Sequence, residues 1–134
     1  MDNDQIARIL KMKNVAIVGM SNKTYRPSYQ TYKYLSRNGY NMLFVNPNYK
    51  VIDQKECYEK LEAIKSNIDV VNIFRKSENV LPIINSAIKI KAKAIWMQEG
   101  VRNDEARNLA RKNGLLVVMN DCILRQHQKT HSHF

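Results

Sequence analysis

The sequence predicts an α/β protein with a doubly wound, mostly parallel five-stranded sheet that carries helices on both faces. Two observations support this fold class. Five short apolar runs, rich in β-branched residues, alternate with stretches whose apolar residues recur at helical spacing. The runs are apolar at nearly every position, which is typical of parallel strands that are covered on both sides by helices.

The apolar runs place the strands, and the stretches between them place the helices. We expect strands over residues 15–18, 42–45, 70–74, 94–97 and 115–119, and helices over residues 4–12, 29–37, 80–90 and 105–112. Gly39 and Gly114 follow two of these helices in the similar phrases RNGYNMLFVN and KNGLLVVMN. A left-handed glycine at this position ends a helix before the next strand begins, so both glycines support the alternation.

A length of 134 residues fits one domain, which we place over residues 1–123, followed by a polar tail over residues 124–134. The tail contains QHQKTHSHF and lacks an apolar face, so we expect it to be flexible. Its histidines, His127, His131 and His133, could bind a transition metal weakly. A disordered terminus is the favoured interpretation, and we predict no metal site.

The two cysteines, Cys57 and Cys122, are far apart and show neither zinc-ligand spacing nor a disulfide framework. Cys122 fits a buried thiol better than a nucleophile, because no neighbour in sequence supplies a base. No apolar stretch approaches the roughly 20 residues of a membrane helix, and the polar N-terminus is unlike a secretory signal. We therefore expect a cytoplasmic protein that does not bind membranes.

Basic residues gather in the loops that should follow the strands. Lys and Arg outnumber Asp and Glu by 22 to 12, which gives a net charge of +10 and favours phosphorylated or polyanionic partners. Open α/β sheets bind ligands beyond the carboxyl ends of their strands. The loops at that edge contain these cations: Lys23, Arg26, Lys50, Arg75, Lys76 and Arg102. The sequence therefore predicts phosphate recognition at the carboxyl edge.

The first of these loops, within VAIVGMSNKTYRPSY, has one glycine, Gly19. It matches neither the dinucleotide pattern G-x-G-x-x-G nor the triphosphate pattern G-x-x-x-x-G-K-[ST]. Lys23 and Arg26 lie at the positive end of the next helix dipole, which is unfavourable unless an anion is shared. Pro27 opens the helix, and Ser28 is a candidate N-cap. We interpret the loop as a phosphate site of another kind.

Six phrases, VAIVGMS, RPSY, FVNPNY, DVVNIFR, AIWMQEGV and VVMNDC, follow one another over residues 15–122. Together they resemble the stand-alone CoA-binding domain proteins, which are related to the CoA-binding domain of the succinyl-CoA ligase alpha subunit. The resemblance implies a Rossmann-like fold and CoA or an acyl-CoA as ligand. The ligase uses a phosphorylated histidine on a following domain, and this sequence ends before such a domain. We therefore predict a binding protein without catalytic residues.

The resemblance also implies a set of ligand-binding residues. Gly19, Ser21 and Lys23 would line the phosphate-binding turn, with Arg26 and Ser28 at its closing edge. Asn46, Pro47 and Lys50 would lie along the adenosine part, and Phe74, Arg75, Trp96 and Gln98 would complete the cleft. Trp96 fits a place in the core equally well. Which cations meet the 3′-phosphate and which the pyrophosphate stays open.

Two other function classes fit parts of the sequence. An NAD(P)-binding enzyme or redox sensor could use the same fold, but the loop lacks two glycines and Asn46 replaces the acidic residue that binds a ribose diol. Nucleic-acid binding rests on the net charge alone, since the tyrosines form no base-stacking motif. A protein partner or a homo-oligomer is compatible with the sequence.

Overall fold

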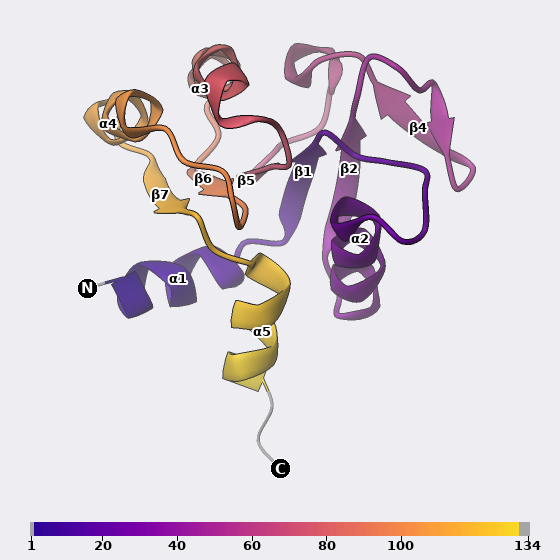
Figure 1. The fold of residues 1–134 in the computed structure, drawn as a ribbon, viewed down its shortest axis with the longest axis horizontal. Coiled ribbons are helices and arrows are strands. Elements are labelled where there is room, and N and C mark those ends of the chain that lie inside the picture. Colours follow the sequence, from indigo (N-terminus) through magenta and orange to yellow (C-terminus); the bar gives the residue numbers. More distant parts are fainter. Residues whose placement is uncertain (1, 132–134) are drawn as a thin grey trace.

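The computed structural model describes residues 2–131, which form a central sheet between two layers of helices (Figure 1). The strands are β1 (Asn14–Val18), β2 (Asn41–Val45), β3 (Val51–Ile52), β4 (Lys55–Tyr58), β5 (Val70–Ile73), β6 (Ala94–Met97) and β7 (Leu116–Met119). The helices are α1 (Asp2–Leu10), α2 (Pro27–Arg37), α3 (Val80–Lys89), α4 (Asp104–Lys112) and α5 (Ile123–His131), with 3₁₀ turns η1 (Leu61–Ala63) and η2 (Ser77–Asn79).

The strand order is β3-β4-β2-β1-β5-β6-β7, and every pair except β3–β4 is parallel. The five expected strands form the continuous parallel part, with Val15 of β1 in register with Met42 of β2 and Val70 of β5. The mostly parallel α/β class is thus confirmed. The expected count of five strands is wrong, because β3 and β4 extend the sheet to seven strands.

The strands β3 and β4 form a hairpin beside β2. Asp53 and Gln54 join them with positive φ angles of 51° and 64°, the conformation that a two-residue type I′ turn requires. The hairpin escaped prediction because its strands have two and four residues, and because Lys55 and Glu56 are exposed. An edge strand needs no continuous apolar run.

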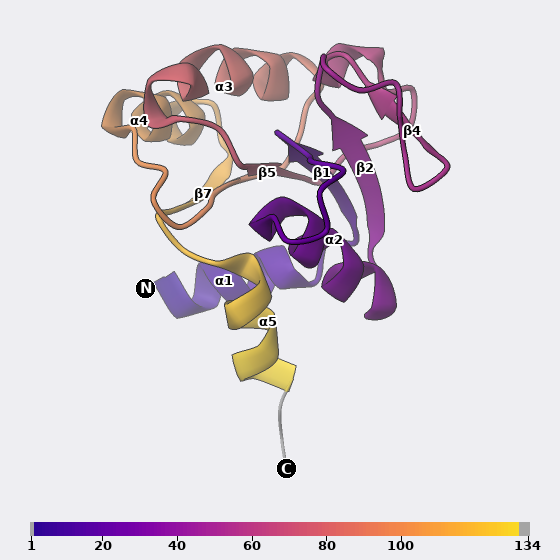
Figure 2. The same ribbon diagram turned by 45° about the vertical axis from the view of Figure 1, so that its right-hand side comes forward.

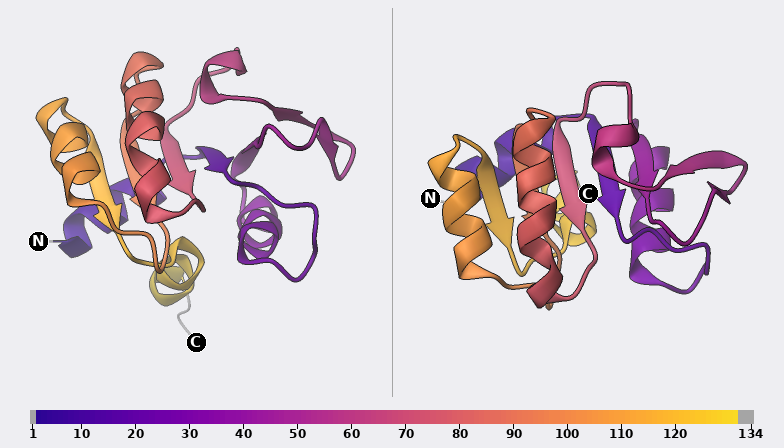
Figure 3. Two further views of the ribbon diagram at one scale, coloured as in Figure 1. Left: turned by 45° about the horizontal axis from the view of Figure 1, so that its top comes forward. Right: turned by 90° about the horizontal axis from the view of Figure 1, so that it is seen from above.

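Two apolar layers pack on the two faces of the sheet, and the alternation along each strand sorts its residues between them. In β1, Ala16 and Val18 join the cluster under α3 and α4, whereas Val15 and Ile17 join the cluster around α1, α2 and α5. Figures 2 and 3 show α3 and α4 side by side on one face and the other three helices on the opposite face. This arrangement confirms helices on both faces.

The C-terminal segment corrects the expectation of a flexible tail that begins at residue 124. Residues Ile123–His131 form α5, which packs beside α1 and α2 (Figure 1). Ile123 and His127 lie one helical turn apart and are buried, so one apolar and one polar side chain dock this otherwise largely exposed helix. His133 lies outside the described residues.

His127 is the buried polar residue that completes this contact. Its Nδ1 lies 2.6 Å from the hydroxyl oxygen of Tyr34, and its ring packs edge-on against Tyr40. Burial lowers the pKa of His127, and neighbouring His131 and Lys13 lower it further. The histidine therefore acts as a neutral packing residue between α5 and α2.

Candidate functional site

A cleft of about 510 Å³ opens at the carboxyl edge of the sheet, where the chain switches sides. The β1–α2 unit leads to β2 on one side of β1, and the following parallel strands extend from β5 on its other side. Gly19 follows β1, Phe74 and Arg75 follow β5, and all three line the cleft. Open α/β sheets bind their ligands at this switch point. The position agrees with the edge that the sequence predicted.

Gly19 sits where the loop after β1 passes closest to β5. Its φ is +92°, and a Cβ atom at this position would lie 2.2 Å from the carbonyl oxygen of Phe74. The Gly19 N–H donates to the carbonyl of Val45 at 2.9 Å, which ties the loop to β2 as well. No residue with a side chain fits here without moving the backbone. Glycine is needed for this crossing even though the loop lacks the familiar glycine-rich pattern.

Three polar side chains fix the loop that follows. Ser28 Oγ accepts a hydrogen bond from the Ser21 N–H at 3.1 Å, and Ser21 Oγ accepts one from the Lys23 N–H at 3.1 Å. Asn46 Nδ2 donates to the carbonyl of Met20 at 2.8 Å. The expectation that Ser28 is the N-cap of α2 is wrong, because Arg26 occupies that position. Ser28 instead lies inside the helix and closes the loop.

These bonds decide which backbone donors can meet an anion. The N–H groups of Gly19, Ser21 and Lys23 already donate within the protein. Arg26 makes no side-chain cap hydrogen bond, so the first turn of α2 keeps the donors that a capped helix would satisfy. The positive end of the α2 dipole therefore offers the amides, and the loop supplies the side chains.

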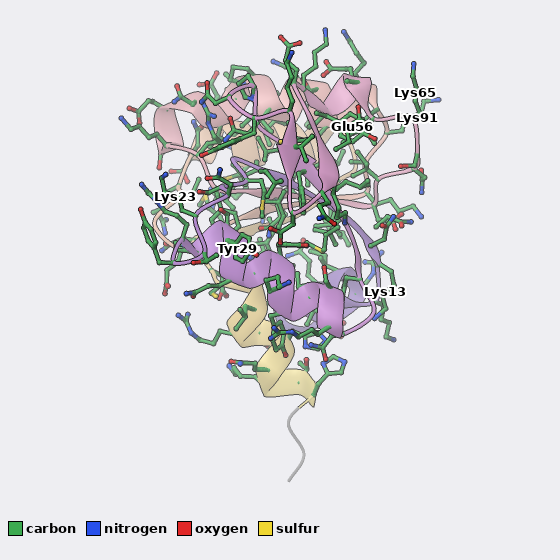
Figure 4. All side chains as sticks on the ribbon, turned by 90° about the vertical axis from the view of Figure 1, so that its right-hand side faces the viewer. Lys13, Lys23, Tyr29, Glu56, Lys65 and Lys91 are labelled. Carbon is green, nitrogen blue, oxygen red and sulfur yellow. The ribbon has the colours of Figure 1, made fainter. Side chains whose placement is uncertain are left out.

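Four cations line the cleft: Lys23, Arg26, Arg75 and Lys76. Within residues 2–131, none of them forms a salt bridge. Figure 4 shows Lys23 beside the start of α2, where Tyr29 lies in the first turn. The loop before α2 and the loop after β5 thus bring four cations to one cleft that includes the N-terminus of α2, which favours a bound anion.

Glu99 is the one carboxylate among the residues that line the cleft. Both of its oxygens accept hydrogen bonds at 3.1 Å from the guanidinium of Arg125 on α5. The hydrogen bonds and the charge of Arg125 lower the pKa of Glu99. Because this carboxylate already has a cation of its own, it does not neutralise the four cations of the cleft.

A buried amide pair lies beneath the cleft. Gln98, which is 3% exposed and lines the cleft, donates from Nε2 to Oδ1 of the fully buried Asn72 in β5. The Nδ2 of Asn72 has no hydrogen-bond partner among the described residues. The pair fixes the Gln98 side chain at the floor of the site, in an otherwise apolar stretch of sheet.

Of the predicted ligand-binding residues, the structure gathers most around this cleft. The predicted residues that line it are Gly19, Ser21, Lys23, Arg26, Ser28, Asn46, Phe74, Arg75 and Gln98. Residues outside the set implied by the resemblance also line it: Pro27, Tyr49, Glu99, Val101 and Lys76, the last of which was expected among the cations of this edge. Lys76 and Val101 stand in the loops FRKSE and QEGVR, so their position after β5 and β6 was the available signal.

Three predicted residues lie elsewhere. Trp96 is fully buried, and its indole N–H donates to the carbonyl of Asp121 at 2.9 Å, so its assignment to the cleft is wrong. Its place in β6 points the ring into the core on the face of the sheet that α1, α2 and α5 cover. Pro47 lines a second hollow of about 220 Å³ on the face of the sheet that α3 covers. Arg75 lines this second hollow as well as the cleft. Lys50 is exposed beside β3 and lines neither hollow.

Both cysteines are free thiols in the described part of the chain. Cys57 is buried, which raises its pKa, and its Sγ donates to the carbonyl of Asn46. No group of three or more His, Cys, Asp or Glu residues within 2–131 is arranged to hold a metal ion. No helix in the same range is long and apolar enough to span a membrane.

Comparison with known proteins identifies the family. The family described as CoA binding domain matches residues 13–128, which is most of the chain and includes every residue of the cleft. The chain belongs to this family. An uncharacterised protein of Bacillus subtilis, YneT, is 32% identical over 127 residues, which cover 94% of each chain.

Solved structures agree on the fold. A hypothetical protein from Pyrococcus horikoshii is 34% identical and superposes with a TM-score of 0.91 over 96% of this chain and 91% of that one. A dinucleotide-forming acetyl-coenzyme A synthetase from Ca. Korarchaeum cryptofilum superposes with a TM-score of 0.71 at 21% identity, over 81% of this chain and 26% of the synthetase. At this identity the second likeness concerns the fold alone.

Proposed function

We propose that this protein binds coenzyme A or an acyl-CoA in the cleft at the β1–β5 switch point. The observation that carries the proposal is the set of four cations around the cleft, two before α2 and two after β5, that form no salt bridge within residues 2–131, in a chain of the CoA-binding domain family. CoA has a pyrophosphate and a 3′-phosphate, and arginines suit such groups because their guanidinium can donate two parallel hydrogen bonds.

The two hollows support a binding mode. Phosphate groups fit beside Lys23, Arg26 and the open amides of α2. Arg75 lines both the cleft and the hollow of Pro47, whose walls also include Val45 and Leu61. We place the adenine ring in this second, more apolar hollow and the pantetheine arm toward Gln98. Arg75 would then contact a phosphate between them. The two free thiols support a reducing compartment such as the cytoplasm.

An NAD(P) function has less support. The position where a dinucleotide-binding protein offers a carboxylate to the ribose diol is held by Asn46. Its Nδ2 donates to Met20, and its Oδ1 accepts from the N–H of Asn48 at 2.9 Å. The side chain is thus engaged in holding two loops together.

Calorimetric titration of the full chain with CoA, acetyl-CoA, a long-chain acyl-CoA and NADPH tests the proposal. We expect saturable binding of the CoA compounds, and a thermal shift equivalent to about 2.7 kcal/mol at a hundred times the Kd. Arg75→Ala should weaken CoA binding roughly 10- to 100-fold, the effect of losing hydrogen bonds to a charged group. Lys93→Ala, at the opposite edge, is the matched control and should leave the Kd unchanged.

Three outcomes would contradict the proposal. Absence of heat and of thermal shift with every CoA compound would exclude CoA as the ligand. Tighter binding of NADPH, in competition with CoA, would favour the dinucleotide alternative. Tight, salt-resistant RNA retention on filters would redirect the function to nucleic acid, since simple charge attraction weakens steeply with salt.

A further inference from the structure

A third hollow, of about 230 Å³, lies at the far edge of the sheet. The edge strand β7 forms its apolar wall, α1 and α4 flank it, and the strands β5 and β6 separate β7 from β1. Gln5 of α1 reaches across this wall, where its Oε1 accepts a hydrogen bond from the Val117 N–H at 3.0 Å. The hollow is therefore a distinct site and shares no lining residue with the CoA cleft.

Three arginines converge on this hollow: Arg102, Arg107 and Arg111. Arg107 and Arg111 are four residues apart on α4, so their side chains lie on one face of the helix and repel each other. Arg102 joins them from the loop that leads into α4. A shared anion is the usual way in which such a cluster is stabilised.

Two carboxylates offset only part of the charge of the three arginines. Asp121, the one carboxylate that lines the hollow, accepts hydrogen bonds from the Cys122 N–H at 2.7 Å and from Gln126 Nε2 at 3.0 Å and 3.3 Å. Its oxygens are engaged at the start of α5. Asp104 contacts Arg107 at 3.4 Å from a largely exposed position.

Arg107 also carries an unsatisfied donor. Its Nε is buried and has no hydrogen-bond partner among the described residues. A buried donor without an acceptor costs free energy, although the Arg107 side chain as a whole is 30% exposed and its Nη2 contacts Asp104. An anion in the hollow would therefore meet the exposed Arg102 and Arg111 and the exposed part of Arg107, rather than the buried Nε.

We propose that this hollow binds a small multivalent oxyanion, a free phosphate or a polycarboxylate, through Arg102, Arg107 and Arg111. Arginine forks recognise both groups by paired hydrogen bonds, and three guanidinium groups can bind several oxygens of one such ion. The volume suits a compact ion, because sites for ligands the size of a drug molecule or larger begin at about 300 Å³. The proposal goes beyond CoA binding and does not depend on it.

Amide NMR titration of the full chain with sodium phosphate and with sodium citrate, each against sodium chloride of equal ionic strength, tests the site. We expect saturable shifts at Val117–Met119 with at least one of the two anions, and the anion that binds more tightly identifies the class. Arg111→Gln should raise the Kd by about tenfold. Arg37→Gln is the matched control, because Arg37 is also an exposed arginine in the last turn of a helix.

The variant Arg75→Ala, in the proposed CoA cleft, distinguishes anion binding beside β7 from ligand binding in that cleft. The shifts at β7 should persist in Arg75→Ala whether or not CoA binds the wild-type protein. The proposal is overturned if sodium chloride alone reproduces the shifts, if neither anion gives saturation, or if Arg111→Gln and Arg37→Gln change the Kd equally.

Discussion

The amino edge of the sheet and its carboxyl edge both carry lysines and arginines, and the edges differ in what those cations contact. At the amino edge, Lys13 lies 4.1 Å from the centre of the Tyr40 ring and Lys93 pairs with Asp69 at 3.4 Å. At the carboxyl edge, Lys23 and Arg75 face the cleft without a salt bridge in the described chain. Figure 4 shows the separation, with Lys23 on one side and Lys13 on the other.

This difference shows why net charge is a weak guide to function. The charge of +10 is spread over both edges. At the carboxyl edge, four cations converge on a cleft that includes the N-terminus of α2, where an anion lowers their mutual repulsion. The contacts that the cations make within the protein, rather than the number of basic residues, point to the candidate site.

The largest effect should follow from Gly19→Ala, which breaks the carboxyl edge. The added Cβ would meet the Phe74 carbonyl oxygen at 2.2 Å, in a backbone conformation that alanine rarely adopts. We expect the free energy of unfolding to fall by at least about 3 kcal/mol and CoA binding to be lost. Urea denaturation measures the first effect and calorimetry the second.

Gly100→Ala is the control for Gly19→Ala. Gly100 lies at the same edge with φ +90°, but a Cβ there meets nothing within 4 Å. The free energy of unfolding of Gly100→Ala should fall by only about 1–2 kcal/mol, the cost of the left-handed backbone conformation for alanine. Equal losses in the two variants would show that the approach of the β1 loop to β5 is unimportant.

A smaller effect is expected for Trp96→Phe, which alters support beneath the carboxyl edge. The change removes the hydrogen bond to the Asp121 carbonyl and leaves a small cavity. The free energy of unfolding should fall by about 1–3 kcal/mol while the Kd for CoA stays unchanged. A higher Kd for CoA in a fully folded Trp96→Phe variant would show that Trp96 does contribute to ligand binding.

Acid should lower the free energy of unfolding through His127, which is buried between α5 and α2 near the amino edge of the sheet. The folded-state pKa of His127 is lowered, chiefly by burial. As the pH falls below the ordinary value of about 6.5, the unfolded chain therefore takes up a proton before the folded one does, and stability declines. In thermal melts, the fall in Tm between neutral and mildly acid pH should be smaller for His127→Gln than for the wild type. Parallel curves for the two proteins would contradict this assignment.

The smallest effect belongs to Lys93→Gln at the amino edge. The Lys93 side chain is 63% exposed, and exposed ion pairs contribute little. The loss in free energy of unfolding should stay below about 1 kcal/mol, and CoA affinity should not change. A loss of CoA affinity comparable to that of Arg75→Ala would remove the distinction between the edges.

Much of the parallel sheet could be predicted because its strands are buried on both faces. Their apolar runs, such as 94–97, stand out against polar connections, and glycines follow α2 and α4 as expected. The hairpin Val51–Tyr58 and helix α5 carry weaker signals. In α5, burial rests mainly on Ile123 and His127, and a polar residue such as histidine gives no apolar periodicity.

The site could be predicted as a set of loops but not as a set of side-chain directions. The cations after β1 and β5 were correctly expected to gather, because strand order brings those loops together. Trp96 shows the limit, since the alternation along β6 turns its ring inward. Arg102 shows it again: it stands in a carboxyl-edge loop but lines the hollow beside β7. Tertiary packing decides both directions.

The contact between Gln5 and β7 has a consequence for how copies of the chain meet. A bare edge strand offers its unpaired N–H and C=O groups to any passing strand, which is a common start of aggregation. Here Gln5 occupies the outward N–H of Val117, and at the other edge the sheet finishes in the two-residue strand β3. Within residues 2–131, neither end of the sheet presents a long free strand edge, so the fold discourages edge-to-edge growth into larger β assemblies.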